Sequence, residues 1–158
     1  MKIALLTSGR LPVPAVCGGA VETKLDYCLD YNEAHQLHDI TVFSIMPPKK
    51  VNKETLHNHY VFFSLNSFWN RVGAKFYSYV NEKPYYDSRI EFYLWRCLRY
   101  IKQNHFDCVL IANRPGYIVK VAECTRAKII SQLNNDYINP DIPVATEMKE
   151  RCSLILTC

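Results

Sequence analysis

The sequence predicts an α/β protein with a Rossmann-like, doubly wound, mostly parallel sheet of about six strands, and two features of the chain predict it. Short apolar runs, typical of strands buried on both faces, alternate with segments whose apolar residues recur at helical spacing. Strands that alternate with helices form parallel βαβ units with right-handed crossovers. The length of 158 residues suits one domain with a substantial core.

A change in the spacing of apolar residues near the start of the chain predicts the first strand and the first helix. A continuous apolar run at 2–8 ends in small residues, which predicts a buried strand. Beyond a loop that contains two prolines, Val21, Leu25 and Leu29 recur at helical spacing. We therefore expect a helix that opens at Gly19.

The rest of the chain continues this alternation. Further strands are predicted in apolar runs at 40–45, 60–65, 108–112, 128–133 and 153–157. Helices are predicted at 87–104, at 117–124 and near 144–151. The longest of them has one apolar stripe, formed by Ile90, Leu94, Cys97, Leu98 and Ile101.

The composition is that of an ordinary globular protein, with 49% hydrophobic and 22% charged residues. A net charge of +4 is too small on its own to indicate nucleic acid, and none is expected as a partner. No stretch reaches the roughly 18 uninterrupted apolar residues of a membrane-spanning helix. Arg10 and two prolines interrupt the apolar start, which favours a strand over a signal peptide.

The cysteines and histidines predict neither disulfides nor a metal site. Seven cysteines are an odd number, and no pair has the two-residue gap of a zinc or redox motif. We interpret them as reduced thiols of a cytosolic protein. The five histidines lack carboxylate or cysteine partners at ligand spacing, so no metal is expected.

The stretch PAVCGGAVET, at 14–23, follows the first strand and contains the candidate binding loop. In an open parallel sheet, ligands bind beyond the carboxyl ends of the strands. Gly18 and Gly19 lie there, directly before a helix whose first N–H groups attract anions. The spacing matches neither the dinucleotide fingerprint nor a Walker loop, and a plain tight turn is the alternative interpretation.

Four short motifs, taken in order, resemble a known family. They are GGAVE at 18–22, LHDITV at 37–42, IANRP at 111–115 and LNND at 133–136. With the last predicted strand, they make the chain resemble the N-terminal half of family 4 (group 1) glycosyltransferases of the GT-B fold. This resemblance extends over the whole chain.

The resemblance implies a domain organisation. GT-B enzymes have two Rossmann-like domains, of which the N-terminal one mainly holds the acceptor. The C-terminal one holds a nucleotide-sugar through two glutamates eight positions apart, a spacing that no glutamate pair in this chain has. Residues 1–158 are thus expected to form one acceptor-side domain without the donor-binding domain, and the chain ends at Cys158 on its last predicted strand.

The resemblance also implies an activity. Family 4 enzymes retain the anomeric configuration and need no metal or other cofactor, with a nucleotide-sugar as co-substrate. Their acceptors include cell-surface polysaccharide, lipopolysaccharide and lipid-linked glycans. We expect such a transferase to work in the cytoplasm, with peripheral contact to the inner face of the membrane as an option, and this fragment to be inactive alone.

The resemblance assigns roles in the loops that follow the first and fourth strands. The Gly-Gly loop of the family lies against the donor diphosphate, a role that falls to Gly18 and Gly19. Glu22 would touch the acceptor or orient the loop, or else merely complement the helix dipole. Arg10 and Arg114 could each hold a phosphate or carboxylate of the acceptor, or form surface salt bridges.

Three polar residues complete the predicted site. Asn113 and Asp136 are expected to contact the acceptor, although Asp136 could instead be a loop cap. Asn134 is the catalytic candidate, at a position where the family often has a histidine near the transferred sugar. Asparagine still forms hydrogen bonds but does not titrate near neutral pH, which leaves the donor phosphate as the base in retaining transfer.

The middle of the chain, 67–102, is aromatic and basic, with seven Lys and Arg against three Asp and Glu. Helical geometry places Phe92, Trp95, Arg96 and Arg99 opposite the apolar stripe of the 87–104 helix. Such a face suits anionic lipid, a partner protein or an acceptor groove, unless a neighbouring loop covers it.

Two further functions stay open at this point. The chain could be the non-catalytic half of a two-chain glycosyltransferase that recruits its partner to a membrane. It could also be an unrelated Rossmann-like domain that binds a nucleotide.

Overall fold

The computed structural model confirms the predicted sheet. It describes residues 1–48, 57–65, 67–80, 87–134, 138 and 145–157. Six parallel strands lie in the order β3-β2-β1-β4-β5-β6, which is a Rossmann-like arrangement. The strands are β1 (Lys2–Leu6), β2 (Asp39–Ile45), β3 (His59–Phe63), β4 (Cys108–Ala112), β5 (Lys128–Leu133) and β6 (Leu154–Thr157).

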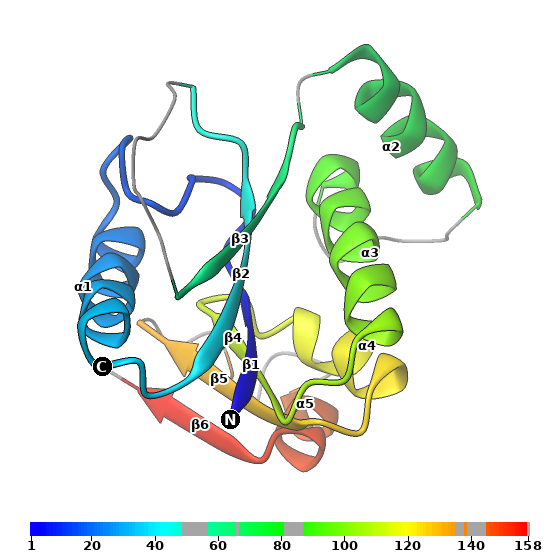
Figure 1. Ribbon diagram of the computed structural model, residues 1–158. Helices are drawn as coiled ribbons and strands as arrows, with labels where there is room; N and C mark the ends of the chain where they lie inside the picture. The colour runs from blue at the N-terminus through cyan, green and yellow to red at the C-terminus, as the bar shows by residue number, and fades with distance from the viewer. Residues whose placement is uncertain (49–56, 66, 81–86, 135–137, 139–144, 158) are drawn as a thin grey trace.

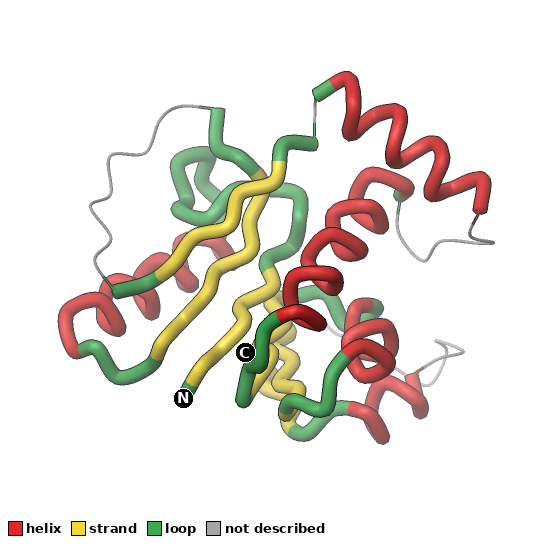
Figure 2. The backbone as a smooth tube through the Cα atoms, turned by 45° about the vertical axis from the view of Figure 1, so that its right-hand side comes forward, coloured by secondary structure: helices red, strands yellow, loops and turns green. Residues whose placement is uncertain are grey.

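Helices cover both faces of this sheet. They are α1 (Ala20–His35), α2 (Phe68–Val80), α3 (Ser88–Gln103), α4 (Tyr117–Cys124) and α5 (Ala145–Arg151). Figure 1 shows α1 on one face and α3, α4 and α5 on the other, while α2 lies outside α3, away from the strands. The same layers are visible in Figure 2, where the sheet is turned.

The central strand β1 pairs with β2 on one side and with β4 on the other. Ile3 is opposite Ile40 of β2 and Cys108 of β4. Alternate residues of β1 enter two cores: Leu6 joins the core under α3 and α4, and Leu5 joins the core under α1. The strand order reverses at the β1–β4 boundary, which is the topological switch point of the sheet.

Tyr93 ties α3 to the carboxyl end of the strands. Its side chain is fully buried, and its hydroxyl donates a hydrogen bond of 2.6 Å to the Phe43 carbonyl at β2. The hydroxyl also lies 3.2 Å from Oγ1 of buried Thr7, just past β1. Burial raises the pKa of Tyr93 well above its usual value, so the phenol stays protonated and can donate.

Two differences from the predicted elements have physical causes. β1 ends at Leu6 because the polar Thr7 and Ser8 leave the strand, although both stay buried. The helix α2 was missed, because its aromatic residues and Gly73 have low helix propensity. One signal for it was present: the Ser67 hydroxyl accepts a hydrogen bond from the Asn70 amide, as an N-cap residue does.

The helix predicted at 87–104 is present as α3, which begins and ends one residue inside these bounds. Asp87 caps α3, since its carboxylate accepts hydrogen bonds from the N–H groups of Arg89 and Ile90. The six cysteines in the described residues are free thiols, and burial raises the pKa of Cys97. No helix in the described part of the chain has the length and apolar character needed to cross a membrane.

The Tyr93 hydroxyl gives a test of this core. We expect Tyr93→Phe to lower the free energy of unfolding by about 1–2 kcal/mol, because one buried hydrogen bond is lost and the Thr7 hydroxyl loses its partner. Tyr100→Phe is the matched control, since Tyr100 is 36% exposed and its hydroxyl bonds to no described residue. It should stay within about 0.5 kcal/mol. Urea unfolding measures both, and equal losses would contradict the assignment.

Candidate functional site

The candidate site lies at the topological switch point, where the loops after β1 and β4 leave the sheet in opposite directions. The β1 loop runs from Thr7 to the start of α1 and includes the glycine pair. The β4 loop begins at Asn113 and leads into α4. Such loops define a crevice beyond the strand ends, the usual ligand position in this class of fold.

The β1 loop is held at several points along its length. The N–H of buried Val13 donates to Ser44 Oγ of β2 at 2.8 Å. The N–H of Ala15 donates to an Asp26 carboxylate oxygen of α1, also at 2.8 Å. The loop therefore has a defined conformation before any ligand arrives, which reduces the entropy lost on binding.

The two glycines differ in what they do. Gly19 has φ +101°, and a Cβ there would lie 2.3 Å from Glu22 Oε2. A side chain at 19 therefore excludes the Glu22 carboxylate from its position. Gly18 has φ +75° and is exposed, and a Cβ there would meet no atom within 4 Å. Gly18 thus leaves open space over the backbone, and Gly19 makes room for Glu22.

The α1 N-terminus next to this pair is uncapped. Gly19 is its N-cap residue and has no side chain to accept a hydrogen bond. The N–H groups of Ala20, Val21 and Glu22 have no acceptor among the described residues. Three free donors and the positive end of the helix dipole attract an anion to this point.

Glu22 orients the loop. It is 5% exposed, and its Oε1 accepts a hydrogen bond of 3.0 Å from Ser8 Oγ. The Ser8 hydroxyl also accepts a bond from the N–H of Arg10. Of the roles considered for Glu22, the loop-orienting one therefore has direct contacts to support it.

The Ser8 carbonyl joins the two loops. It accepts hydrogen bonds from Arg114 Nε at 3.1 Å and from the Tyr117 hydroxyl at 3.2 Å. Arg114 thereby braces the β1 loop. The Arg10 side chain is exposed and forms no ion pair with a described residue, so the surface salt bridge considered for it is absent there.

The remaining predicted residues are partly brought together. Asn113 has a left-handed φ of +54°, and its Oδ1 accepts a hydrogen bond of 3.1 Å from the Asn134 N–H. These two asparagines link the loops that follow β4 and β5, at the carboxyl ends of the strands. Asp136 lies outside the described residues.

Sequence reasoning missed Ser8, Gly9 and Tyr117. Gly9 packs beneath the loop, where a Cβ would lie 2.9 Å from the Tyr93 ring. A signal for Ser8 and Gly9 existed, because small residues directly after a buried strand mark a close approach of backbone. Tyr117 gave no such signal, since its contact with Ser8 depends on the β1–β4 pairing.

The aromatic and basic residues predicted on the outer face of α3 lie away from the switch point. Phe92, Trp95, Arg96 and Arg99 line a cavity of about 480 Å³ between α2 and α3. Helix α2, rather than a loop, packs on part of this face, and Phe92 is half-buried against it. None of the switch-point residues lines that cavity.

The described part of the site offers backbone donors suited to an anion at the uncapped helix end, and its hydroxyl–carboxylate pair, Ser8 and Glu22, orients the loop. Ser8, Glu22 and Arg114 are engaged with one another through the loop. Among the described residues, no three His, Cys, Asp or Glu side chains gather as a metal site would require. The fold is a Rossmann-like domain, and an uncapped helix N-terminus beside an exposed glycine lies at its switch point.

Comparison with known proteins gives two curated relatives. The chain is 30% identical over 122 residues to the spore coat protein SA of Bacillus subtilis (strain 168), a match that covers 77% of this chain and 25% of that protein. It is 37% identical over 138 residues to the "Putative glycosyltransferase YtcC" of the same strain, covering 86% of this chain and 27% of that protein. No family model matches the chain.

This chain spans about a quarter of the length of both relatives. The similarity to a protein named as a glycosyltransferase agrees at a coarse level with the resemblance found in the four motifs.

The contact between Gly19 and Glu22 can be tested by stability. We expect Gly19→Ala to cost about 2–4 kcal/mol, because it combines a strained φ with a clash against the carboxylate. Gly18→Ala, the matched control, should cost about 1–2 kcal/mol from its φ alone.

Replacing the carboxylate should relieve the clash. In a double-mutant cycle, Gly19→Ala with Glu22→Ala should be less destabilised than the sum of the single variants by about 1 kcal/mol or more. Denaturant unfolding of all four proteins gives this coupling. Strictly additive losses would show that Gly19 does not serve to seat Glu22.

Proposed function

We propose that this chain is the acceptor-side domain of a retaining glycosyltransferase. The enzyme would transfer a sugar from a nucleotide-sugar to a cell-surface polysaccharide, a lipopolysaccharide or a related glycan, which includes lipid-linked acceptors. One observation carries the proposal: the uncapped α1 N-terminus beside the exposed Gly18, at the switch point of a Rossmann-like sheet. The named glycosyltransferase relative supports the same reaction class.

In the proposed mechanism, the donor diphosphate lies over the backbone of Gly18 and Gly19. The free N–H groups at 20–22 and the helix dipole stabilise the negative charge that grows on the leaving phosphate. The Ser8 hydroxyl engages Glu22 Oε1, and Glu22 Oε2 lies close to Gly19. The role of Glu22 is to keep the loop in the conformation that presents the donors.

The other residues would serve the acceptor. Arg10 has an exposed guanidinium beside the loop and would hold a phosphate or carboxylate of the acceptor. Asn113 and Asn134 would hydrogen-bond sugar hydroxyls near the transferred group, and Asp136 would contact the acceptor. Asn134 cannot act as a base, so the proposed proton acceptor is the donor phosphate itself.

The nucleotide would be held by a second Rossmann-like domain, on the same polypeptide or on a partner chain. We propose that residues 1–158 alone are inactive, that the enzyme needs no metal or other cofactor, and that it works in the cytoplasm. A recruiting half without catalysis and an unrelated nucleotide-binding domain are the alternatives that the experiment must separate.

The test uses the complete reading frame, incubated with a panel of nucleotide-sugars and glycan acceptors. Release of nucleoside diphosphate should persist in EDTA, and the product should keep the anomeric configuration of the donor. Arg10→Gln should lower kcat/KM by about 10- to 100-fold, as expected for one lost charge-assisted contact. Gly18→Ala should lower kcat by about 100-fold through misplacement of the diphosphate.

The matched control is Arg126→Gln. Arg126 is exposed just before β5, at the amino ends of the strands and opposite the candidate site. It should leave turnover unchanged. If Gly18→Ala and Arg10→Gln also leave turnover unchanged, the site assignment is wrong. Tight binding of a free nucleotide by residues 1–158, without transfer by the complete frame, would favour the nucleotide-binding alternative.

A further inference from the structure

Helix α2 carries an apolar stripe that no part of the described chain covers. Its residues recur at three- and four-residue intervals, so they share one face of the helix. They are Phe68, Trp69, Val72, Phe76 and Tyr79, with exposed fractions of 71, 79, 45, 70 and 90%. A contiguous exposed aromatic face of this kind marks an interaction surface.

The opposite side of α2 is fixed to α3, which holds most of the stripe outward, while Trp69 also borders the cavity between the two helices. Ala74 is 3% exposed, and Gly73 lies so close to α3 that a Cβ would be 2.7 Å from the Phe92 ring. Asn70 Oδ1 accepts a hydrogen bond of 2.8 Å from Arg96. The exposed aromatic residues therefore belong to a helix seated on the fold, visible outside α3 in Figure 1.

The charge around the stripe is positive. Helix α2 contains no acidic residue, and it presents Arg71 and Lys75 to solvent. On α3, Arg89 and Arg99 are exposed, and Arg99 lines the cavity between the two helices together with Trp69. Among the described residues, no carboxylate pairs with Arg71, Arg89 or Arg99.

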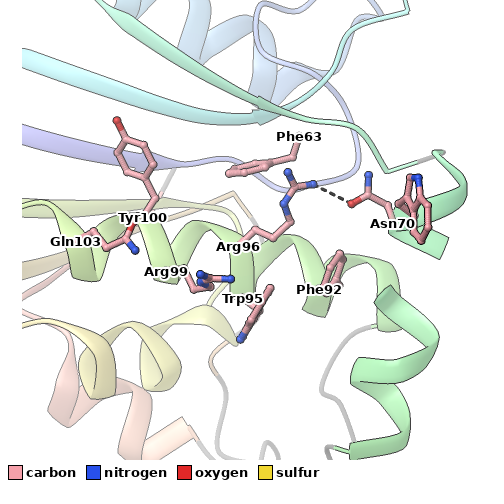
Figure 3. Close-up of a pocket in the computed structure, with 9 residues that line it drawn as sticks. Phe63, Asn70, Phe92, Trp95, Arg96, Arg99, Tyr100 and Gln103 are labelled. Carbon is pink, nitrogen blue, oxygen red and sulfur yellow. Dashed lines mark hydrogen bonds between the residues drawn. The ribbon is translucent and has the colours of Figure 1, made fainter. Parts of the chain in front are cut away.

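Aromatic rings, rather than carboxylates of the described residues, contact two arginines that line the cavity between the helices. Figure 3 shows Arg96 between the Phe63 ring and Asn70, with the guanidinium 4.5 Å from the ring centroid. Arg99 lies 5.0 Å from the Trp95 ring centroid. Cation–π contacts orient these charges, and no carboxylate of the described residues pairs with them.

We propose that α2 lies in the headgroup region of an anionic lipid bilayer, with the arginines of α3 facing the same surface. Aromatic residues favour the membrane interface, and exposed arginines complement acidic headgroups. A purely apolar protein partner would leave these charges uncompensated. The inference goes beyond the proposed glycosyl transfer and does not depend on it.

The chain contains its own probe. Its two tryptophans, Trp69 and Trp95, both line the cavity between α2 and α3. Their emission should shift to the blue when the protein meets vesicles that contain equal amounts of phosphatidylcholine and phosphatidylglycerol. Vesicles of phosphatidylcholine alone should produce little shift and little co-sedimentation.

Variants separate the apolar and the charged contributions. Trp69→Ser with Phe76→Ser should reduce partitioning into the anionic vesicles by about tenfold or more, measured by co-sedimentation. Arg71→Gln with Arg99→Gln should also reduce it by about tenfold and weaken its dependence on salt. Circular dichroism checks that each variant is folded.

The matched control changes two exposed tyrosines on α1, which lies across the sheet from α2. Tyr27 and Tyr31 are 72% and 58% exposed, and Tyr27→Ser with Tyr31→Ser should leave vesicle binding unchanged. Three results would overturn the proposal: no binding to anionic vesicles, equal loss in the control, or self-association of the protein through α2 in place of lipid binding.

Discussion

The pairing of β1 with two neighbours at once is the constraint on which the rest of this structure depends. Because β2 and β4 flank the same strand, the loops that follow β1 and β4 begin side by side and then turn to opposite faces of the sheet. The Ser8 carbonyl can then accept bonds from Arg114 and Tyr117. The glycine loop, its glutamate and the α1 N-terminus all take their positions from this junction.

Much of the fold could be predicted, because each strand is a short apolar run and most helices have a clear apolar stripe. The sequence pattern for α2 was ambiguous for a physical reason. Its apolar residues face outward, so the helix lacks the usual relation between an apolar stripe and the core. Its side toward α3 includes the small residues Gly73 and Ala74 beside Tyr77, whose ring contacts Phe92, so only one large residue there suggests a packing face.

The candidate site was predicted in part. The position of Gly18 and Gly19 follows from their place after the first strand, but their separate roles do not. That distinction rests on the direction of the Glu22 side chain, which only the folded loop defines. Arg114 was predicted from its place after β4. Its hydrogen bond to the Ser8 carbonyl joins residues 106 positions apart, so no local sequence pattern predicts it.

The hydrogen bond between Ser8 and Arg114 joins residues 106 positions apart, and this separation has a consequence for the order of events during synthesis. At translation rates of about 5–20 residues per second, β1 waits roughly 5–20 s before β4 leaves the ribosome. During that interval β1 can pair with β2, but its other edge has no partner. The glycine loop lacks its brace for the same time, so we expect the binding crevice to form late and cooperatively, once the fourth strand closes the sheet.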